Sequence, residues 1–162
     1  MNYYNEIKTN LINNEVYKKV KDYSKNRSDL NTYYNVGKLL FEAGKHYGEG
    51  IIKEYSIKLT NELGKGYTFT SLTRMKKFCC LIEKVATMSQ QLTYGHYVEI
   101  LPINDVNKIK YYINITEFYN LSIRELRQKI KSKEYERLDE KTKLKLITKE
   151  YELIWYYILK LI

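Results

Sequence analysis

The chain has 162 residues, which suits one domain with its own core, and its 28 lysines and arginines outnumber its 19 acids to give a net charge of +9. It contains no apolar run of about 18 residues, and its start lacks the basic and apolar regions of a signal peptide, so we expect a cytoplasmic protein without a membrane segment. The positive charge favours a polyanionic partner such as duplex DNA, although AT-rich codon usage would also enrich lysine.

One proline and seven glycines interrupt the chain, so we expect an all-α fold. A first helix is predicted over residues 4–25, and a second from Ser28 or Asp29, either of which can cap it, to Gly44. Together they suggest a helical hairpin, followed by a loop at 45–50. The buried face of the first helix is expected to contain Ile7, Leu11, Val16, Val20 and Tyr23.

A glycine-containing turn at residues 64–69 joins two further amphipathic helices, at 51–63 and 70–86. Thr70 or Ser71 can cap the second of them. Its apolar residues recur at helical spacing and predict an inward stripe of Leu72, Met75, Cys79 and Ile82. A helix, a turn and a helix with a basic outer face are typical of a helix-turn-helix. This turn is longer than the usual length of about three or four residues, which leaves the docking geometry open.

The outer face of the helix at 70–86 is the predicted DNA-binding surface. Residues 64–86 carry five lysines and arginines against one acid. We expect Thr73, Arg74 and Lys77 to face the groove of the DNA. The residues expected to hold phosphates are Lys65, Lys76 and Lys84.

Three further helices are predicted at 93–101, 105–119 and 123–137. The first of these stops before the single proline, which cannot continue a helix. The last begins at a capping box, in which Ser122 and Glu125 would exchange hydrogen bonds with each other's backbone.

Residues 139–162 depart from a plain globular pattern, because the final turns of the predicted helix are apolar nearly all round. Such a helix needs cover on more than one side, either from its own domain or from a second chain. Lys160 and the shortness of the apolar run argue against membrane insertion. We expect a homodimer whose interface contains Ile154, Trp155, Ile158 and Leu161.

Four blocks of sequence over about residues 30–138 form a recognisable pattern. They are Tyr34-Asn35-Val36-Gly37-Lys38; Leu63-Gly64-Lys65-Gly66-Tyr67 leading to Leu72, Arg74-Met75 and Phe78; Leu92-Thr93-Tyr94-Gly95-His96-Tyr97; and Ser122-Ile123-Arg124-Glu125-Leu126. In order and spacing this pattern resembles the YhcG-type N-terminal domain. The resemblance implies a helical DNA-binding domain, normally followed by a PDDEXK nuclease domain, from mobile or restriction-associated genes. The chain stops at Ile162, too soon for the nuclease half.

The sequence contains no evident catalytic or metal-binding set. A PDDEXK site needs an Asp and a Glu-x-Lys on adjacent strands, and the single Glu-x-Lys, Glu6-Ile7-Lys8, lies in a helical pattern. Cys79 and Cys80 lack the gap of a zinc motif. His96 could contact phosphate or transfer a proton, but a lone histidine without a nearby carboxylate is more often a packing residue. We therefore expect no metal, no cofactor and no enzymatic activity.

These observations predict an all-α, YhcG-type domain at residues 1–138 that contains a helix-turn-helix-like pair, followed by a long apolar helix at 139–162 for packing or oligomerisation. Its expected function is the non-catalytic binding of duplex DNA. The alternative is a protein-interaction scaffold that assembles a separately encoded nuclease or restriction subunit. RNA binding is a third possibility.

Overall fold

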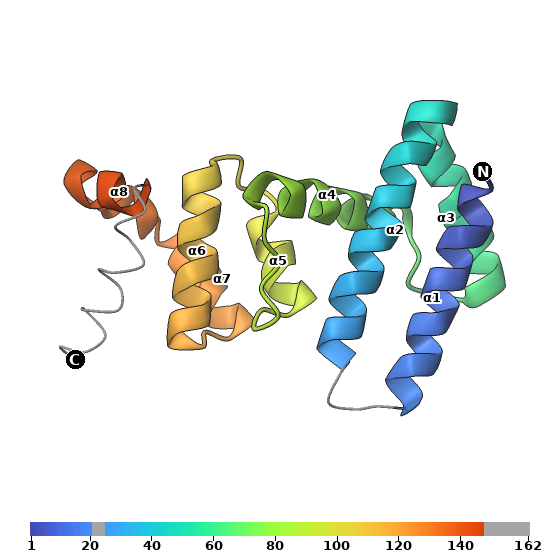
Figure 1. Cartoon of the computed structure of the whole chain (residues 1–162), viewed down its shortest axis with the longest axis horizontal. Coiled ribbons are helices and arrows are strands. Elements are labelled where there is room, and N and C mark those ends of the chain that lie inside the picture. The colour runs from blue at the N-terminus through green and yellow to red at the C-terminus, as the bar shows by residue number, and fades with distance from the viewer. Residues whose placement is uncertain (21–24, 148–162) are drawn as a thin grey trace. The chain divides into compact units, whose positions relative to one another are not determined.

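The computed structural model of the chain describes residues 1–20 and 25–147. Within these ranges the chain is all-α, with no strand, and none of the helices has both the length and the apolar character that a membrane crossing requires (Figure 1). The helices are α1 Tyr3–Val20, α2 Lys25–Tyr47, α3 Gly50–Leu63, α4 Phe69–Val85, α5 Tyr94–Ile100, α6 Val106–Tyr119, α7 Ile123–Lys131 and α8 Glu140–Ile147, with a 3₁₀ turn, η2, at Tyr135–Arg137.

The chain divides into two units, Met1–Leu101 with α1 to α5 and Pro102–Ile162 with α6 to α8. This division lies earlier than the predicted domain boundary at residue 138. Of the apolar helix predicted at 139–162, the described residues include only α8, in which Leu144 is 61% exposed, and residues 148–162 lie outside them. The predicted interface residues lie outside the described residues: Ile154, Trp155, Ile158 and Leu161.

One face of α1 is buried, but the sequence predicted only part of it correctly. Ile7 and Leu11 are buried as expected, and Asn14 is buried beside them. Val16 is 57% exposed. It follows Ile7 by nine residues, and at about 100° per residue nine steps place it on the opposite side of the helix. The side chains of Val20 and Tyr23 lie outside the part that the structure describes.

The N-terminal end of α2 is tied to α1 by polar side chains. The helix begins at Lys25, so Ser28 and Asp29 lie inside it and the prediction that one of them caps it is wrong. Instead the Ser28 hydroxyl donates a hydrogen bond to Asn14 Oδ1 (2.5 Å), and Asn14 Nδ2 donates one to Asp29 Oδ1 (2.9 Å). Asp29 also pairs with Lys18 at 2.7 Å. Residues that were expected to end a helix therefore join two helices.

The C-terminal end of α2 also extends beyond the prediction. The helix passes through Gly44 and ends at Tyr47, so the predicted loop at 45–50 is reduced to Gly48 and Glu49. Gly44 is buried, and a Cβ atom there would lie 2.9 Å from Glu49 Oε1. This glycine leaves room for the Glu49 carboxylate and does not end the helix. Gly48, with a φ of 83°, makes the turn.

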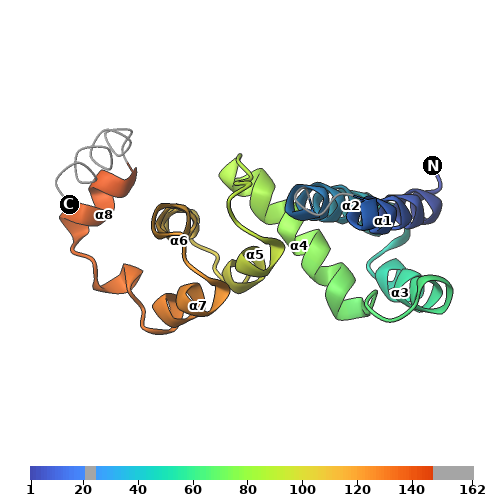
Figure 2. The same cartoon turned by 90° about the horizontal axis from the view of Figure 1, so that it is seen from below.

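The main packing partner of α4 is α2, and the two helices cross at Gly37 (Figure 1 and Figure 2). A Cβ atom at Gly37 would lie 2.2 Å from the Met75 carbonyl oxygen and 2.9 Å from Cβ of Cys79. The missing side chain therefore lets the two backbones approach closely. The packing of α4 against α3, its partner in the predicted helix-turn-helix, is less extensive.

In the second unit, Tyr112 of α6 connects the three segments that follow one another in the chain. Its hydroxyl donates a hydrogen bond to the Lys129 carbonyl oxygen in α7 (3.4 Å) and accepts one from the Tyr135 N–H in η2 (3.4 Å). The predicted helix at 123–137 is shorter in the structure, because Lys133 adopts a φ of 54° just after α7 ends. The buried residues of α6 are Ile109, Tyr111, Tyr112, Ile113, Ile115 and Thr116.

Candidate nucleic-acid interface

The turn between α3 and α4 has a defined backbone. Gly64 and Gly66 have φ values of 96° and 129°, in the left-handed region that favours glycine. The Ser56 hydroxyl in α3 donates a hydrogen bond to the Tyr67 carbonyl oxygen (3.0 Å), which fastens the end of the turn to the preceding helix. The turn therefore presents its side chains from a fixed backbone.

Thr68 caps α4, so the predicted cap at Thr70 or Ser71 is wrong. Thr68 has an extended backbone, and its side chain accepts a hydrogen bond from the Ser71 N–H (3.2 Å). The helix accordingly begins at Phe69. A threonine in this position satisfies one of the N–H groups that the first turn of a helix leaves unpaired.

The predicted inward stripe of α4 is confirmed, and the helix is buried more widely than the stripe requires. The four predicted residues are all buried: Leu72, Met75, Cys79 and Ile82. Phe78, Leu81 and Val85 are buried as well. The Phe78 ring lies 5.3 Å from the ring of Tyr94 and 5.0 Å from that of Tyr97, so α5 covers a further side of α4. Only a narrow part of α4 remains for a ligand.

That remaining part of α4 is basic. Arg74, Lys77 and Lys84 are exposed, and no ion pair joins them to another described residue. At about 100° per residue they lie within roughly 80° of one another around the helix axis. Lys65, in the turn before α4, is also exposed and likewise unpaired within residues 25–147. These four cations can bind phosphate oxygens without first breaking another contact.

Two of the predicted DNA-contacting residues are placed differently. Lys76 pairs with Glu49 (2.5 Å), its ammonium lies 5.7 Å from the centre of the Phe41 ring, and its side chain is 18% exposed. It would have to leave both contacts to bind a phosphate. The Thr73 hydroxyl is buried and finds no hydrogen-bond partner among the described residues, so it faces the protein interior.

His96 occupies a structural position at the start of α5. It is 7% exposed, and its Nδ1 accepts a hydrogen bond from the Thr93 N–H (3.0 Å) and lies 2.9 Å from the Thr93 hydroxyl. The histidine therefore takes the place that a glutamate or glutamine usually has in a capping box. This geometry supports its interpretation as a packing residue.

The cysteines and acids do not form a reactive centre in the part of the chain described. No group of three or more His, Cys, Asp or Glu side chains that could hold a metal ion occurs among these residues. Burial raises the pKa of the Cys79 thiol to about 11, so it stays protonated near neutral pH. Cys80 is only partly buried and is not in a disulfide.

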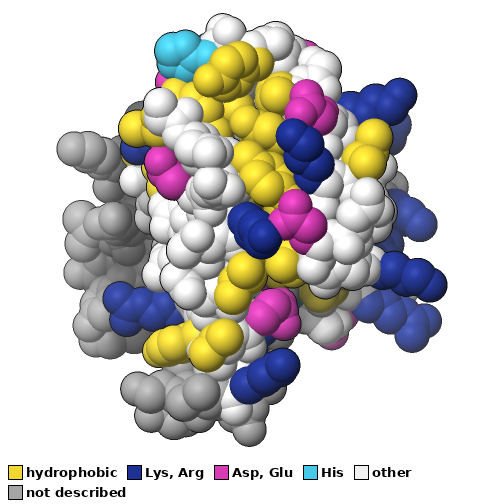
Figure 3. All heavy atoms as spheres, turned by 90° about the vertical axis from the view of Figure 1, so that its right-hand side faces the viewer, with side chains coloured by type: hydrophobic (Ala, Val, Ile, Leu, Met, Phe, Trp, Pro, Cys, Tyr) yellow, Lys and Arg dark blue, Asp and Glu magenta, His cyan; other side chains and the backbone are white. Residues whose placement is uncertain are grey.

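A different kind of surface lies over α1 and α3, where Figure 3 shows a strip of apolar side chains among lysines and acids. A groove of about 520 Å³ in this region includes Tyr3, Tyr4, Tyr47, Ile51 and Tyr55 in its lining. Two ion pairs on these helices join Lys8 to Glu62 and Lys58 to Glu54. Because its charges are mixed and paired, this surface suits a protein partner better than a polyanion.

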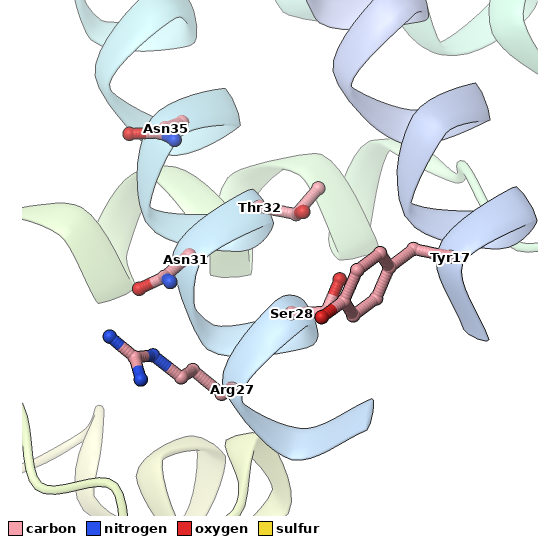
Figure 4. A pocket seen from close by; sticks show the side chains of 6 residues that line it. All are labelled: Tyr17, Arg27, Ser28, Asn31, Thr32 and Asn35. Carbon is pink, nitrogen blue, oxygen red and sulfur yellow. The ribbon is translucent and has the colours of Figure 1, made fainter. Parts of the chain in front are cut away.

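The sequence reasoning missed a polar pocket between α1 and α2 (Figure 4). It has a volume of about 250 Å³ and is lined by Tyr17, Arg27, Ser28, Asn31, Thr32 and Asn35. A signal for it was present, since Arg27, Asn31 and Asn35 recur every four residues and so share one face of a helix.

Comparison with known proteins identifies the family. The family model of the DUF1016 N-terminal domain matches residues 7–137, which include all four sequence blocks that resemble the YhcG type. No curated protein and no solved structure matched the chain. Because the match covers most of its length, the chain belongs to the DUF1016 N-terminal domain family, the N-terminal domain of YhcG-like proteins.

Proposed function

We propose that this chain is a module that binds duplex DNA through the outer face of α4. The observation that carries the proposal is the group of three exposed cations on that face, Arg74, Lys77 and Lys84, none of which is paired with another described residue. Lys65 adds a fourth in the preceding turn. The other sides of α4 are packed against the protein, so the directions of these side chains are set before DNA arrives.

The physical chemistry of phosphate binding supports this role. Cations that neutralise DNA phosphates release condensed counterions, which gives favourable and strongly salt-dependent binding. An arginine such as Arg74 can also make two parallel hydrogen bonds to one phosphate or to a guanine edge. The net charge of +9 would add attraction at longer range. The resemblance to the YhcG type implies the same partner.

Replacing both Arg74 and Lys77 with alanine tests the proposal. Neither side chain is buried or paired with a described residue, so the double variant should unfold at the same temperature as the parent. Each lost phosphate contact should reduce the slope of log K against log salt by about 0.9, so we expect a total reduction of nearly two. A mobility-shift titration at several salt concentrations measures the slope and the affinity together.

A matched control removes the same charge from other helices. Lys53 in α3 and Lys110 in α6 are exposed, and neither is paired within the described ranges. Lys53→Ala combined with Lys110→Ala should weaken binding much less than the α4 pair. Equal binding by the two double variants would show that any attraction comes from net charge alone, and the α4 interface would then be abandoned.

We also infer that the chain does not cut DNA by itself. The one Glu-x-Lys in the sequence lies in α1, where Lys8 pairs with Glu62, and not on a strand beside an aspartate. Purified protein should therefore leave plasmid DNA intact in the presence of magnesium or manganese. Cleavage that survives purification and disappears in His96→Ala would contradict this inference.

The alternative is a scaffold that assembles a nuclease or restriction subunit, and the apolar strip over α1 and α3 favours it (Figure 3). The homodimer expected from the sequence is a separate proposal, because a dimer would also present two recognition helices to two half-sites of DNA. Sedimentation of the parent, and of a variant with Ile154→Asp and Ile158→Asp, tests the dimer. A parent that sediments as a monomer at micromolar concentration would remove it.

A further inference from the structure

The polar pocket between α1 and α2 has a lining suited to an anion (Figure 4). Figure 4 shows Arg27, Asn31 and Asn35 following one another along one side of α2, while Tyr17 approaches from α1. Arginine and asparagine side chains can donate several hydrogen bonds each. No carboxylate lines the pocket, and Arg27 contributes the single formal charge of its lining. A negatively charged ligand would therefore meet attraction without a repelling group in the wall.

Several donors in this pocket have no partner within the described residues. Arg27, Asn31 and Asn35 make no hydrogen bond or ion pair with another described residue. Thr32 is 9% exposed, lines the same pocket, and also makes no hydrogen bond within the described ranges. A ligand in the pocket would offer hydrogen-bond partners to these side chains. Ser28, in contrast, already donates to Asn14.

The acids closest in sequence to this lining are already paired. Asp29 pairs with Lys18 at 2.7 Å, and Glu15 pairs with the same lysine at 3.3 Å. Burial, the largest single effect, would lower the pKa of Lys18, but the hydrogen bond with Asp29 together with the nearby Tyr33, Asp29 and Glu15 outweighs it and raises that pKa above the ordinary value. Lys18 therefore stays charged and offsets one of the two negative charges. Lys38, one turn beyond Asn35, is exposed and unpaired in the described structure, and adds positive charge along the same face.

We propose that this pocket binds a phosphate group. Arg27 provides a forked donor for two of its oxygens, and Asn31, one helical turn along α2, provides a neutral donor for a third. Asn35 lies about 12 Å from Arg27 along the helix, so it would contact a neighbouring group of the ligand. The volume of about 250 Å³ is smaller than a typical drug-sized site, which suits one phosphate and its sugar. The site is distinct from the α4 face, since all of its residues come from α1 and α2, and it does not depend on α4 binding DNA.

The phosphate can come from a free nucleotide or from a nucleic-acid strand, and a titration distinguishes the two. Chemical-shift changes of the Arg27, Asn31 and Thr32 amides would be followed in the full chain with inorganic phosphate, with deoxyadenosine monophosphate and with a short DNA duplex. Saturable shifts with the two small probes identify a site for free phosphates. Shifts that appear only with the duplex identify a backbone contact.

Variants decide whether the pocket itself is responsible. Arg27→Ala should weaken binding of the responding probe about tenfold or more, because a charged hydrogen bond is lost. Arg27→Lys keeps the charge without the fork and should recover part of the affinity. Lys53→Ala, a matched loss of one exposed charge on α3, should change nothing. If no probe binds saturably, or if Arg27→Ala binds as well as the parent, the proposal is wrong.

Arg74→Ala with Lys77→Ala should leave binding of the small probes unchanged, which separates this site from the α4 interface.

Discussion

α4 and α7 are both basic helices, but they are held in the fold in different ways. α4 has 17 residues, and its buried apolar residues run from Leu72 to Val85 in contact with α2, α3 and α5. α7 has 9 residues and buries only Leu126. Its exposed cations, such as Arg124 and Lys131, therefore extend from a helix with little attachment to the core.

The comparison separates basic composition from a preorganised basic surface. A cation on α4 extends from a backbone that is fixed by a core around most of the helix, so little backbone freedom remains to be lost when a ligand binds. A cation on α7 depends on one buried leucine, on the capping box at the N-terminal end and on the hydrogen bond from Tyr112 to the Lys129 carbonyl oxygen. Similar charge on the two helices should therefore have different consequences for binding and for stability.

The largest expected effect concerns the attachment of α4. Gly37→Ala would place a Cβ atom 2.2 Å from the Met75 carbonyl oxygen, so α2 and α4 would have to move apart. We expect a loss of about 1–3 kcal/mol in the free energy of unfolding, as is usual for overpacking. Thermal or urea denaturation followed by circular dichroism measures this loss.

Gly50→Ala is the matched control for this prediction. Nothing lies within 4 Å of a Cβ atom at Gly50, which begins α3. Alanine at this position should be neutral or slightly stabilising, because it lowers the entropy of the unfolded chain. Equal stability of the Gly37 and Gly50 variants would mean that α4 is not closely packed on α2, and the contrast with α7 would disappear.

A smaller effect is expected from removing charge on α7. Arg124 and Lys131 are exposed and lack partners in the described structure, as Arg74 and Lys77 do. Arg124→Ala combined with Lys131→Ala removes the same charge as the α4 double variant. We expect the α7 double variant to reduce the slope of log K against log salt by less than the α4 double variant, for which a reduction of about two is expected. A mobility-shift titration of the two variants side by side makes the comparison. A larger loss of DNA affinity in the α7 variant would mean that the DNA-binding surface lies on the second unit.

Most helices could be predicted from the sequence because their starts depend on local chemistry. Asp105 caps α6 by accepting hydrogen bonds from the N–H groups of Asn107 (2.8 Å) and Lys108 (3.2 Å). Ser122 and Glu125 form the predicted capping box of α7. Each of these interactions joins residues at most three positions apart, so the pattern is visible in the printed chain.

Some differences from the predictions concern residues whose roles depend on distant partners. Ser28 and Asp29 have the chemistry of a cap, but Asn14 and Lys18 of another helix engage them. Lys76 has the spacing of a DNA contact, which stays a prediction, but in the fold its partner is Glu49, 27 positions away. Which of two possible partners a polar side chain takes is decided by packing, and packing is not visible in local spacing.

Several residues in the sequence blocks that suggested the family stabilise the fold. Gly37 permits the crossing of α2 and α4, and His96 completes the cap of α5. Tyr97 is buried, and its hydroxyl accepts a hydrogen bond from the Ser89 N–H (2.8 Å). These blocks identify the fold well for this reason. They indicate much less about which exposed residues contact a ligand, and Arg27 lies outside all of them.

The smallest expected effect concerns the two helix caps, which differ in their response to acid. The Glu125 carboxylate accepts hydrogen bonds from the Ser122 N–H and from the Ser122 hydroxyl, both at 2.7 Å. These bonds lower the pKa of Glu125 below its ordinary value of 4.5. α4 is capped by Thr68, a neutral side chain that does not titrate.

The direction of the acid effect follows from this lowered pKa. In the unfolded chain Glu125 takes up its proton near 4.5, whereas in the folded chain it does so at a lower pH. Its stabilisation of α7 is therefore complete above about pH 5 and is lost as the pH falls through the folded pKa.

Amide hydrogen exchange in the first turn of α7 measures this loss. Relative to the exchange rate of an unprotected amide at the same pH, exchange there should become faster as the pH falls from about 5 to 3. The first turn of α4 should show no such change, and Glu125→Gln should abolish the change in α7, because the amide accepts the same bonds without titrating. An acid response in α7 that persists in Glu125→Gln would show that another carboxylate is responsible, and the two caps would no longer explain the difference between the helices.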